Sequence, residues 1–172
     1  MNIFGRKLVK EKNRNDITSI FKLISILLLL CGFCHANCLE KISAKYSISE
    51  KLLWSIAIVE SGVNPLAIGP INTNGTTDFG LMQINSSWIP KLEEYGIHKE
   101  DLFKPCVSVE IAAWVLAQNI STYGNTWQAV GAYNSVKLSS QIKYIDKVAK
   151  IFGNIRLEDI RNKYLQLAEG LK

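Results

Sequence analysis

A single turn-rich segment interrupts an otherwise helical sequence, and this contrast most limits what the chain can fold into. From residue 38 onward, apolar residues recur at spacings of three and four, the period of amphipathic helices. Residues 63–79 break that period, and an Asn-Gly pair such as the one found there favours a tight hairpin turn. The turn-forming residues are Pro65, Gly69, Pro70, Asn74 and Gly75. We therefore expect a mainly α domain with a long loop or a small β-ribbon at 63–79.

Five segments carry the helical period, and residues 96–106 connect two of them. The first begins at a serine cap and ends at Gly62, and the third ends at Gly124. Apolar spacings of three and four also continue through 154–172, so this tail is expected to form an amphipathic helix that packs back onto the domain. The predicted helices cover residues 47–62, 85–96, 108–124, 125–135 and 138–153.

The first 36 residues have the pattern of a secretory signal peptide. A basic stretch precedes the short apolar run 21–34, and Cys-His-Ala follows it. We expect cleavage after Ala36 and export to the periplasm, with an uncleaved inner-membrane anchor as the alternative. This divides the chain into a signal peptide at 1–36, a catalytic domain at 37–153 and a tail at 154–172.

The net charge of +5 belongs mostly to this leader. Residues 1–36 hold six of the 20 basic residues and two of the 15 acidic ones. The remaining chain has 14 basic and 13 acidic residues and lacks the clustered basic surface that nucleic-acid binding requires. No nucleic-acid partner is expected.

Cysteine and histidine usage points to a disulfide and away from metal chemistry. Cys31 and Cys34 lie inside the apolar run, so the mature chain keeps Cys38 and Cys106. In an exported protein, two widely spaced cysteines are most simply a disulfide. His98 is the one histidine left after cleavage, and there is no glycine-rich phosphate loop. We expect neither a metal nor a cofactor.

Glu60 is the first candidate for catalysis. It follows Leu53, Ile56 and Ala57 at helical spacing, which places it on the core-facing side of the predicted helix 47–62. Desolvation there would raise the pKa of its carboxyl, and a protonated glutamic acid can donate a proton to a leaving-group oxygen. The turn-rich segment that follows is where a cleft is expected.

Two polar motifs downstream could hold a sugar. In "GLMQIN", the amides could orient the ligand by hydrogen bonds, and neighbouring apolar side chains could contact a sugar ring. In "GAYNS", a helix rich in small residues ends in two polar groups. The candidates are Gln83 and Asn85 for hydrogen bonds, Met82 and Trp88 for apolar contact, and Tyr133 and Asn134 at the second motif.

Taken in order, "IVESG", "GLMQIN" and "AYN" resemble the soluble lytic transglycosylases of the lysozyme superfamily. The resemblance covers roughly residues 38–152 and implies an α+β, lysozyme-like fold. It also implies cleavage of the β-1,4 bond between N-acetylmuramic acid and N-acetylglucosamine in peptidoglycan, leaving a 1,6-anhydromuramyl end. By the same resemblance, Glu60 is the acid and base, Ser61 stands beside it, and Tyr144 binds the catalytic carboxyl. Gln83 and Asn134 resemble the family's sugar-binding groups.

A finer resemblance is to small exported transglycosylases, invasion proteins among them, that accompany type III secretion systems, type IV pili and conjugation machines. It rests on "DLFKPC", "AAWVLAQNI", "TWQAVGAYN" and the cysteine pair. It implies a protein that opens the peptidoglycan mesh locally for a secretion system or pilus. Nothing in the sequence demands more than a monomer.

At Asp78 the sequence differs from the larger members of the family, which usually have a small apolar residue in this region. The stretch "NGTTDFGLMQINSSW" instead resembles animal-type lysozymes, in which an aspartate is the second catalytic carboxylate. Asp78 lies 18 residues after Glu60, far enough for a loop to return across a cleft. A retaining hydrolase uses two carboxyls about 5 Å apart. Three alternatives stay open: a transglycosylase assisted by Asp78, a lysozyme-type hydrolase using both acids, and an assembly factor that binds peptidoglycan without cutting it.

Overall fold

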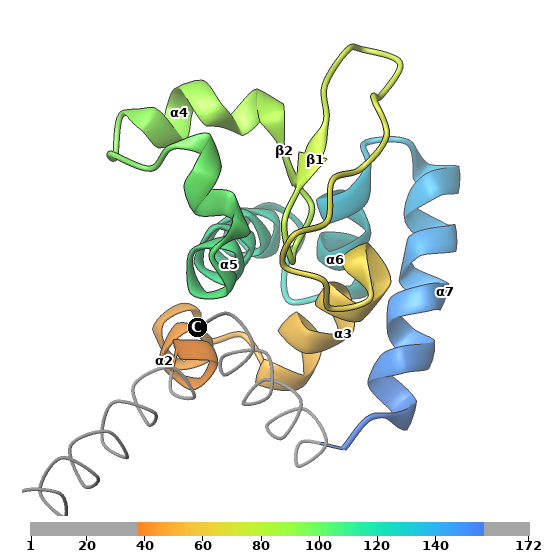
Figure 1. Cartoon of the computed structure of the whole chain (residues 1–172). Helices are drawn as coiled ribbons and strands as arrows, with labels where there is room; N and C mark the ends of the chain where they lie inside the picture. Colours follow the sequence, from red (N-terminus) through yellow and green to blue (C-terminus); the bar gives the residue numbers. More distant parts are fainter. Residues whose placement is uncertain (1–37, 157–172) are drawn as a thin grey trace, which may run out of the picture.

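The computed structural model describes residues 38–156, in which helices surround a two-stranded ribbon (Figure 1). The predicted signal peptide and the tail from residue 157 lie outside the described residues. The elements are α2 (Cys38–Tyr46), α3 (Glu50–Ser61), β1 (Asp78–Phe79), β2 (Ile84–Asn85), η1 (Ser86–Trp88), α4 (Ile89–Glu93), η2 (Lys99–Phe103), α5 (Pro105–Tyr123), α6 (Trp127–Asn134) and α7 (Leu138–Asn154).

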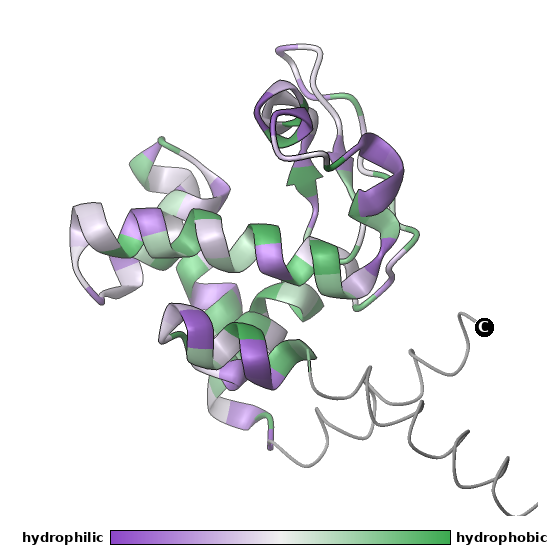
Figure 2. Ribbon diagram, turned by 90° about the vertical axis from the view of Figure 1, so that its left-hand side faces the viewer, coloured by the Kyte–Doolittle hydropathy of each residue, from purple (hydrophilic) through white to green (hydrophobic). Residues whose placement is uncertain are grey.

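The longest helix, α5, lies at the centre of the fold. It packs against α2 and α6, while α7 packs against α3 and α6 (Figure 1). Apolar and polar residues alternate along the helices in Figure 2, as expected of amphipathic helices around a shared core. The mainly α fold predicted from the periodicity is confirmed. None of the helices between residues 38 and 156 combines the length and apolar character needed to span a bilayer.

Helix α3 forms as its sequence pattern predicts. Leu53, Ile56 and Ala57 are buried on the core side. Gly62 ends the helix with φ +61°, the left-handed conformation that glycine adopts without steric cost. Glu60 therefore occupies the last turn of α3, on the same side as the buried residues.

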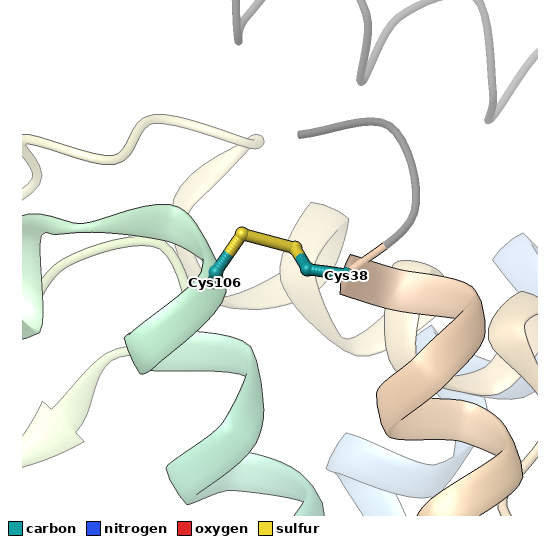
Figure 3. The surroundings of a disulfide bond; sticks show 2 residues. All are labelled: Cys38 and Cys106. Carbon is teal, nitrogen blue, oxygen red and sulfur yellow. A yellow bond between two sulfur atoms is a disulfide. The ribbon is translucent and has the colours of Figure 1, made fainter. Parts of the chain in front are cut away.

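A disulfide joins the first residue of α2 to the first turn of α5 (Figure 3). Cys38 and Cys106 have their Cα atoms 5.9 Å apart and are separated by 68 residues in the chain. The structure thus contains the disulfide expected from cysteine usage. It closes a loop that includes α3 and the ribbon.

The turn-rich segment forms the expected loop and ribbon. Its two arms are tied by backbone hydrogen bonds, from Gly69 N to Asp78 O at 2.8 Å and from Asn72 N to Thr76 O at 2.7 Å. The Asn-Gly pair forms the tip of this loop. The turn between β1 and β2 is instead residues 80–83, so the ribbon lies one turn later than the Asn-Gly signal suggests.

The apolar stripe predicted for the last helix is only partly correct. Tyr144 and Val148 are buried in α7, as is the polar Gln141. Ile142, which begins the predicted apolar stripe of Ile142, Ile145, Val148, Ala149 and Phe152, is instead 52% exposed. Polar side chains that satisfy buried hydrogen bonds take core positions here: Gln141 donates to Ser135 O at 2.9 Å.

Candidate active site

A cavity of about 730 Å³ opens where α3 and α6 end beside the ribbon. Glu60 lines it from α3, Asp78 and Asn85 from the two strands, and Asn134 from the end of α6. The arms of the turn-rich loop complete one wall. A concave site of this size that carries two carboxyls can hold a large polar ligand. The other lining residues are Asn72, Thr73, Asn74, Thr76, Gln83, Ile84, Ser87, Trp88, Val115, Tyr133, Ser135 and Val136.

The carboxyl of Glu60 is poised to exchange a proton near neutral pH. Desolvation by burial raises the pKa of Glu60 from 4.5 to about 7. The hydrogen bond from Tyr144 opposes this rise, and the negative charge of Asp78 adds to it. Lys147 has a smaller lowering effect. Burial therefore decides the outcome, as the helical stripe predicted.

Tyr144 reaches Glu60 from α7, 84 residues away in the chain. Its hydroxyl donates a hydrogen bond of 2.5 Å to Glu60 Oε1. Burial raises the pKa of Tyr144 above its ordinary value, so the hydroxyl remains a donor. Tyr144 is 5% exposed and orients the carboxyl from behind.

Two side-chain amides hold the carboxylate of Asp78. Asn85 Nδ2 donates to Asp78 Oδ1 at 2.7 Å, and Asn72 Nδ2 donates to Oδ2 at 3.0 Å. Both amides also donate to Thr76 Oγ1, at 2.9 and 3.1 Å respectively. Asn85 in addition caps the helical turn η1 through its Oδ1 atom. Asp78 thus anchors a network of side chains that faces the cavity.

The tetrapeptide 80–83 is held by three helices. Ser61 of α3 donates to Leu81 O at 2.7 Å, and Tyr133 of α6 donates to Met82 O at 2.9 Å. The hydroxyl of Ser108, in α5, accepts from Met82 N at 3.1 Å. These bonds fix the ribbon, and with it Asp78, relative to the helix that carries Glu60.

Gly80 and Gln83 show why this tetrapeptide has its sequence. Gly80 has φ +75°, and a Cβ there would meet Leu102 O at 2.0 Å, so no larger residue fits. Gln83 has φ +49° and donates from Nε2 to Gly80 O at 3.0 Å. The strained backbone and the internal hydrogen bond place the Gln83 amide at the cavity wall.

The structure brings most predicted site residues together but divides their roles. Gln83, Asn85, Tyr133 and Asn134 line the cavity with the two acids. Ser61 and Tyr144 are not among the described residues that line it, and each supports a neighbour through a hydrogen bond.

For the two apolar candidates the outcome differs. Trp88 lines the cavity, with its ring 5.3 Å from that of Trp114. Met82 has no exposed surface, so the prediction that it contacts a sugar ring is wrong. Met82 is a core residue like its neighbour Leu81, and of the tetrapeptide only Gln83 lines the cavity.

Sequence reasoning missed Asn72 and Thr76. Both were treated as loop residues, although a polar run that returns toward a carboxylate could have suggested hydrogen-bond partners for Asp78. Their role depends on how the loop folds back at its tip, which local sequence does not specify.

Comparison with known families shows to which family this chain belongs. The model for the Transglycosylase SLT domain matches residues 37–150. The chain belongs to this family. It is a lytic transglycosylase, and its substrate is peptidoglycan.

Two relatives of this lytic transglycosylase align over most of their length. Protein IpgF of Shigella flexneri is 37% identical over 155 residues, which is 86% of this chain and 93% of that protein. Invasion protein IagB of Salmonella typhimurium is 41% identical over 116 residues, or 67% of this chain and 72% of that protein. The resemblance to an invasion-protein subgroup of lytic transglycosylases is confirmed.

The fold agrees with a solved structure. An inactive mutant of the lytic transglycosylase Slt from Pseudomonas aeruginosa superimposes with a TM-score of 0.50 at 20% identity. The match covers 78% of this chain and 22% of that much longer one. The lysozyme-like architecture predicted from the motifs is confirmed by this likeness.

Proposed function

We propose that this enzyme cleaves the MurNAc-β-1,4-GlcNAc bond with Glu60 as both acid and base and leaves 1,6-anhydromuramyl ends. The observation that carries the proposal is the single carboxyl with a pKa of about 7, oriented by Tyr144 at the wall of a large polar cavity. Such a group is protonated in a useful fraction of molecules at neutral pH and can take the proton back.

Each step of this reaction balances without water. Glu60 transfers its proton to the glycosidic oxygen as the bond from that oxygen to C1 of the muramyl sugar breaks. The C6 hydroxyl of the same sugar then attacks C1, and the Glu60 carboxylate accepts the hydroxyl proton. The enzyme returns to its starting state, and the ring closure replaces hydrolysis.

Asp78 is assigned an electrostatic role. Its two carboxylate oxygens accept hydrogen bonds from Asn85 and Asn72, which hold them in place and reduce their nucleophilicity. A fixed negative charge beside the cavity stabilises the positive charge that develops at C1. The same placement favours a second candidate, a lysozyme-type hydrolase in which Asp78 works with Glu60 and water attacks.

Mass spectrometry of the muropeptides released from purified peptidoglycan separates the two candidates. The exported, oxidised protein should give products that lack one water and carry 1,6-anhydro ends. Reducing ends would overturn the transglycosylase assignment in favour of the hydrolase. The Glu60→Gln variant is the control and should release neither product.

For the biological role, we propose that the protein acts in the periplasm and opens the peptidoglycan locally for a secretion system or pilus. The name of the Salmonella relative, an invasion protein, supports this setting, and so do the expected signal peptide and the disulfide. The site residues required are Glu60 and Asp78 for chemistry, with Gln83, Asn85, Tyr133 and Asn134 near the sugar.

A cell assay tests whether cutting is needed for that role. If the protein only bound peptidoglycan as an assembly factor, Glu60→Gln would restore secretion or piliation in a deletion strain. The proposal expects no restoration by this variant at wild-type protein level, because the acid is missing while the cavity shape is kept.

A further inference from the structure

A second cavity, of about 380 Å³, lies at the opposite ends of the helices that form the active site. Helix α3 has its cap residue Ser49 and its first-turn residue Leu52 in the lining of this cavity, and it reaches the catalytic cavity with Glu60. Helix α6 begins there at Trp127 and ends at the catalytic cavity with Asn134. Eleven residues of α-helix separate Ser49 from Glu60, or roughly 16 Å along the axis. The two cavities are therefore distinct.

The chemistry of the second cavity points to an uncharged ligand. All ten lining residues within 38–156 are neutral, so this part of the chain offers no charged lining group for a metal ion or a phosphate. One side is aromatic: Trp127 is 41% exposed, and its ring lies 5.9 Å from that of Phe152 in an edge-to-face arrangement. Lys51 lies over the Phe152 ring without lining the cavity. A ligand with an apolar face could pack on this pair.

The rim of the same cavity presents unused hydrogen-bonding groups. Ser49 stands at the start of α3, yet its hydroxyl makes no capping bond. The side chains of Ser47 and Asn125, both exposed, make no hydrogen bond to any other residue in the range 38–156. Two hydroxyls and an amide thus surround the aromatic surface, and a ligand carrying hydroxyl or acetamide groups could pair with them.

This combination repeats the sugar-facing chemistry of the catalytic cavity without its acids. There, too, a partly exposed tryptophan, Trp88, lies among asparagine, serine and threonine side chains. We infer that the second cavity is a non-catalytic subsite for a peptidoglycan glycan strand, centred on Trp127. It binds amino-sugar units of the polymer that the active site does not hold. The inference rests on peptidoglycan being the substrate, but not on whether water or the C6 hydroxyl attacks.

The consequence for activity is a dependence on substrate length. A long strand, or a second strand in the same mesh, can occupy both cavities and gains affinity from the second contact. A tetrasaccharide bound in the catalytic cavity is cleaved whether or not a second molecule binds at Trp127, so its kinetics do not depend on that contact. Loss of the aromatic contact should then raise KM on intact sacculi roughly fivefold, with kcat unchanged, and leave the tetrasaccharide kinetics as they are.

The variant that tests this is Trp127→Leu, which keeps an apolar side chain against Phe152. The matched control is Tyr123→Ala, because Tyr123 is also 41% exposed but does not line the cavity. Initial rates are measured on sacculi and on a soluble tetrasaccharide. Equal KM values for wild type and Trp127→Leu on sacculi would overturn the inference. So would an equal loss on both substrates, which indicates damage to the active site or the fold.

A binding experiment separates this inference from the proposed reaction. Full-length Glu60→Gln protein is titrated with an N-acetylglucosamine tetramer and followed by amide chemical shifts. The inference predicts shifts at Ser49 and Asn125 in this protein. When the substitution Trp127→Leu is introduced into the same chain, these shifts should disappear while the shifts near Asn134 remain. That result supports the subsite even if the product analysis fails. Absence of shifts at Ser49 and Asn125 overturns it. Shifts that appear only after deletion of 157–172 would also overturn the inference, because they would mean that the tail occupies the cavity in the intact chain.

Discussion

Replacing Glu60 by glutamine should abolish a pH dependence of stability that the wild-type protein owes to this carboxyl. Its pKa is about 7 in the folded protein and near 4.5 in the unfolded chain. Between these values the folded protein holds a proton that the unfolded chain releases. The contribution of this carboxyl to the free energy of unfolding is therefore greatest below pH 4.5 and is lost as the pH rises through 7. At 1.36 kcal/mol per pH unit, the loss is about 3 kcal/mol by pH 8.

Glutamine is the right replacement because it has the shape of protonated glutamic acid and can still accept the hydrogen bond from Tyr144. Urea unfolding of the oxidised protein between pH 4 and pH 8 measures the effect. The variant should match wild type at pH 4 and exceed its stability by about 3 kcal/mol at pH 8. Glu93→Gln, on the exposed surface of α4, should keep the wild-type profile. Parallel profiles for wild type and Glu60→Gln would refute the reasoning, because the carboxylate would then be solvated in the folded state.

Three further changes test other parts of the structure. Tyr144→Phe removes the hydrogen bond that stabilises the Glu60 carboxylate. The alkaline limb of kcat/KM plotted against pH should therefore move up by about one pH unit. An unchanged limb would contradict this. Cys106→Ser opens the disulfide to Cys38 and should lower the free energy of unfolding by about 4 kcal/mol in the chain-entropy model, and a loss under about 1 kcal/mol in urea unfolding would show little contribution from the disulfide. Gly80→Ala meets a backbone carbonyl in a left-handed conformation and should cost at least about 2 kcal/mol by thermal unfolding; a wild-type melting curve would mean the loop shifts freely.

Helical periodicity predicted the helices well because their faces are set by local spacing. It placed α3 and its end at Gly62 within a few residues, and it put Glu60 on the desolvated side. It did not single out α2, a nine-residue helix that the disulfide joins to α5. Short helices depend on tertiary contacts more than on propensity.

The network around Asp78 could not be predicted, because it depends on the fold of an irregular loop. The Asn-Gly pair predicted a turn, but it did not predict that the loop would bring Asn72 back against Asp78. The same limit applies to Met82, whose burial follows from the backbone of the tetrapeptide rather than from its neighbours in sequence. Where the backbone leaves regular geometry, side-chain direction no longer follows a fixed period.

The hydrogen bonds of the tetrapeptide 80–83 fix the cavity wall that lies next to the helix carrying Glu60. Ser61 and Tyr133 look like sugar-binding residues, but each donates its hydroxyl proton to a carbonyl of this tetrapeptide. They consequently hold the ribbon against α3, next to the Glu60 carboxyl whose pKa is raised by burial. We therefore expect Asn134 and Trp88, which line the cavity and make no such bond to the tetrapeptide, to be available for contact with the sugar. Removing the Ser61 hydroxyl should therefore act through the pKa of Glu60 rather than through substrate affinity.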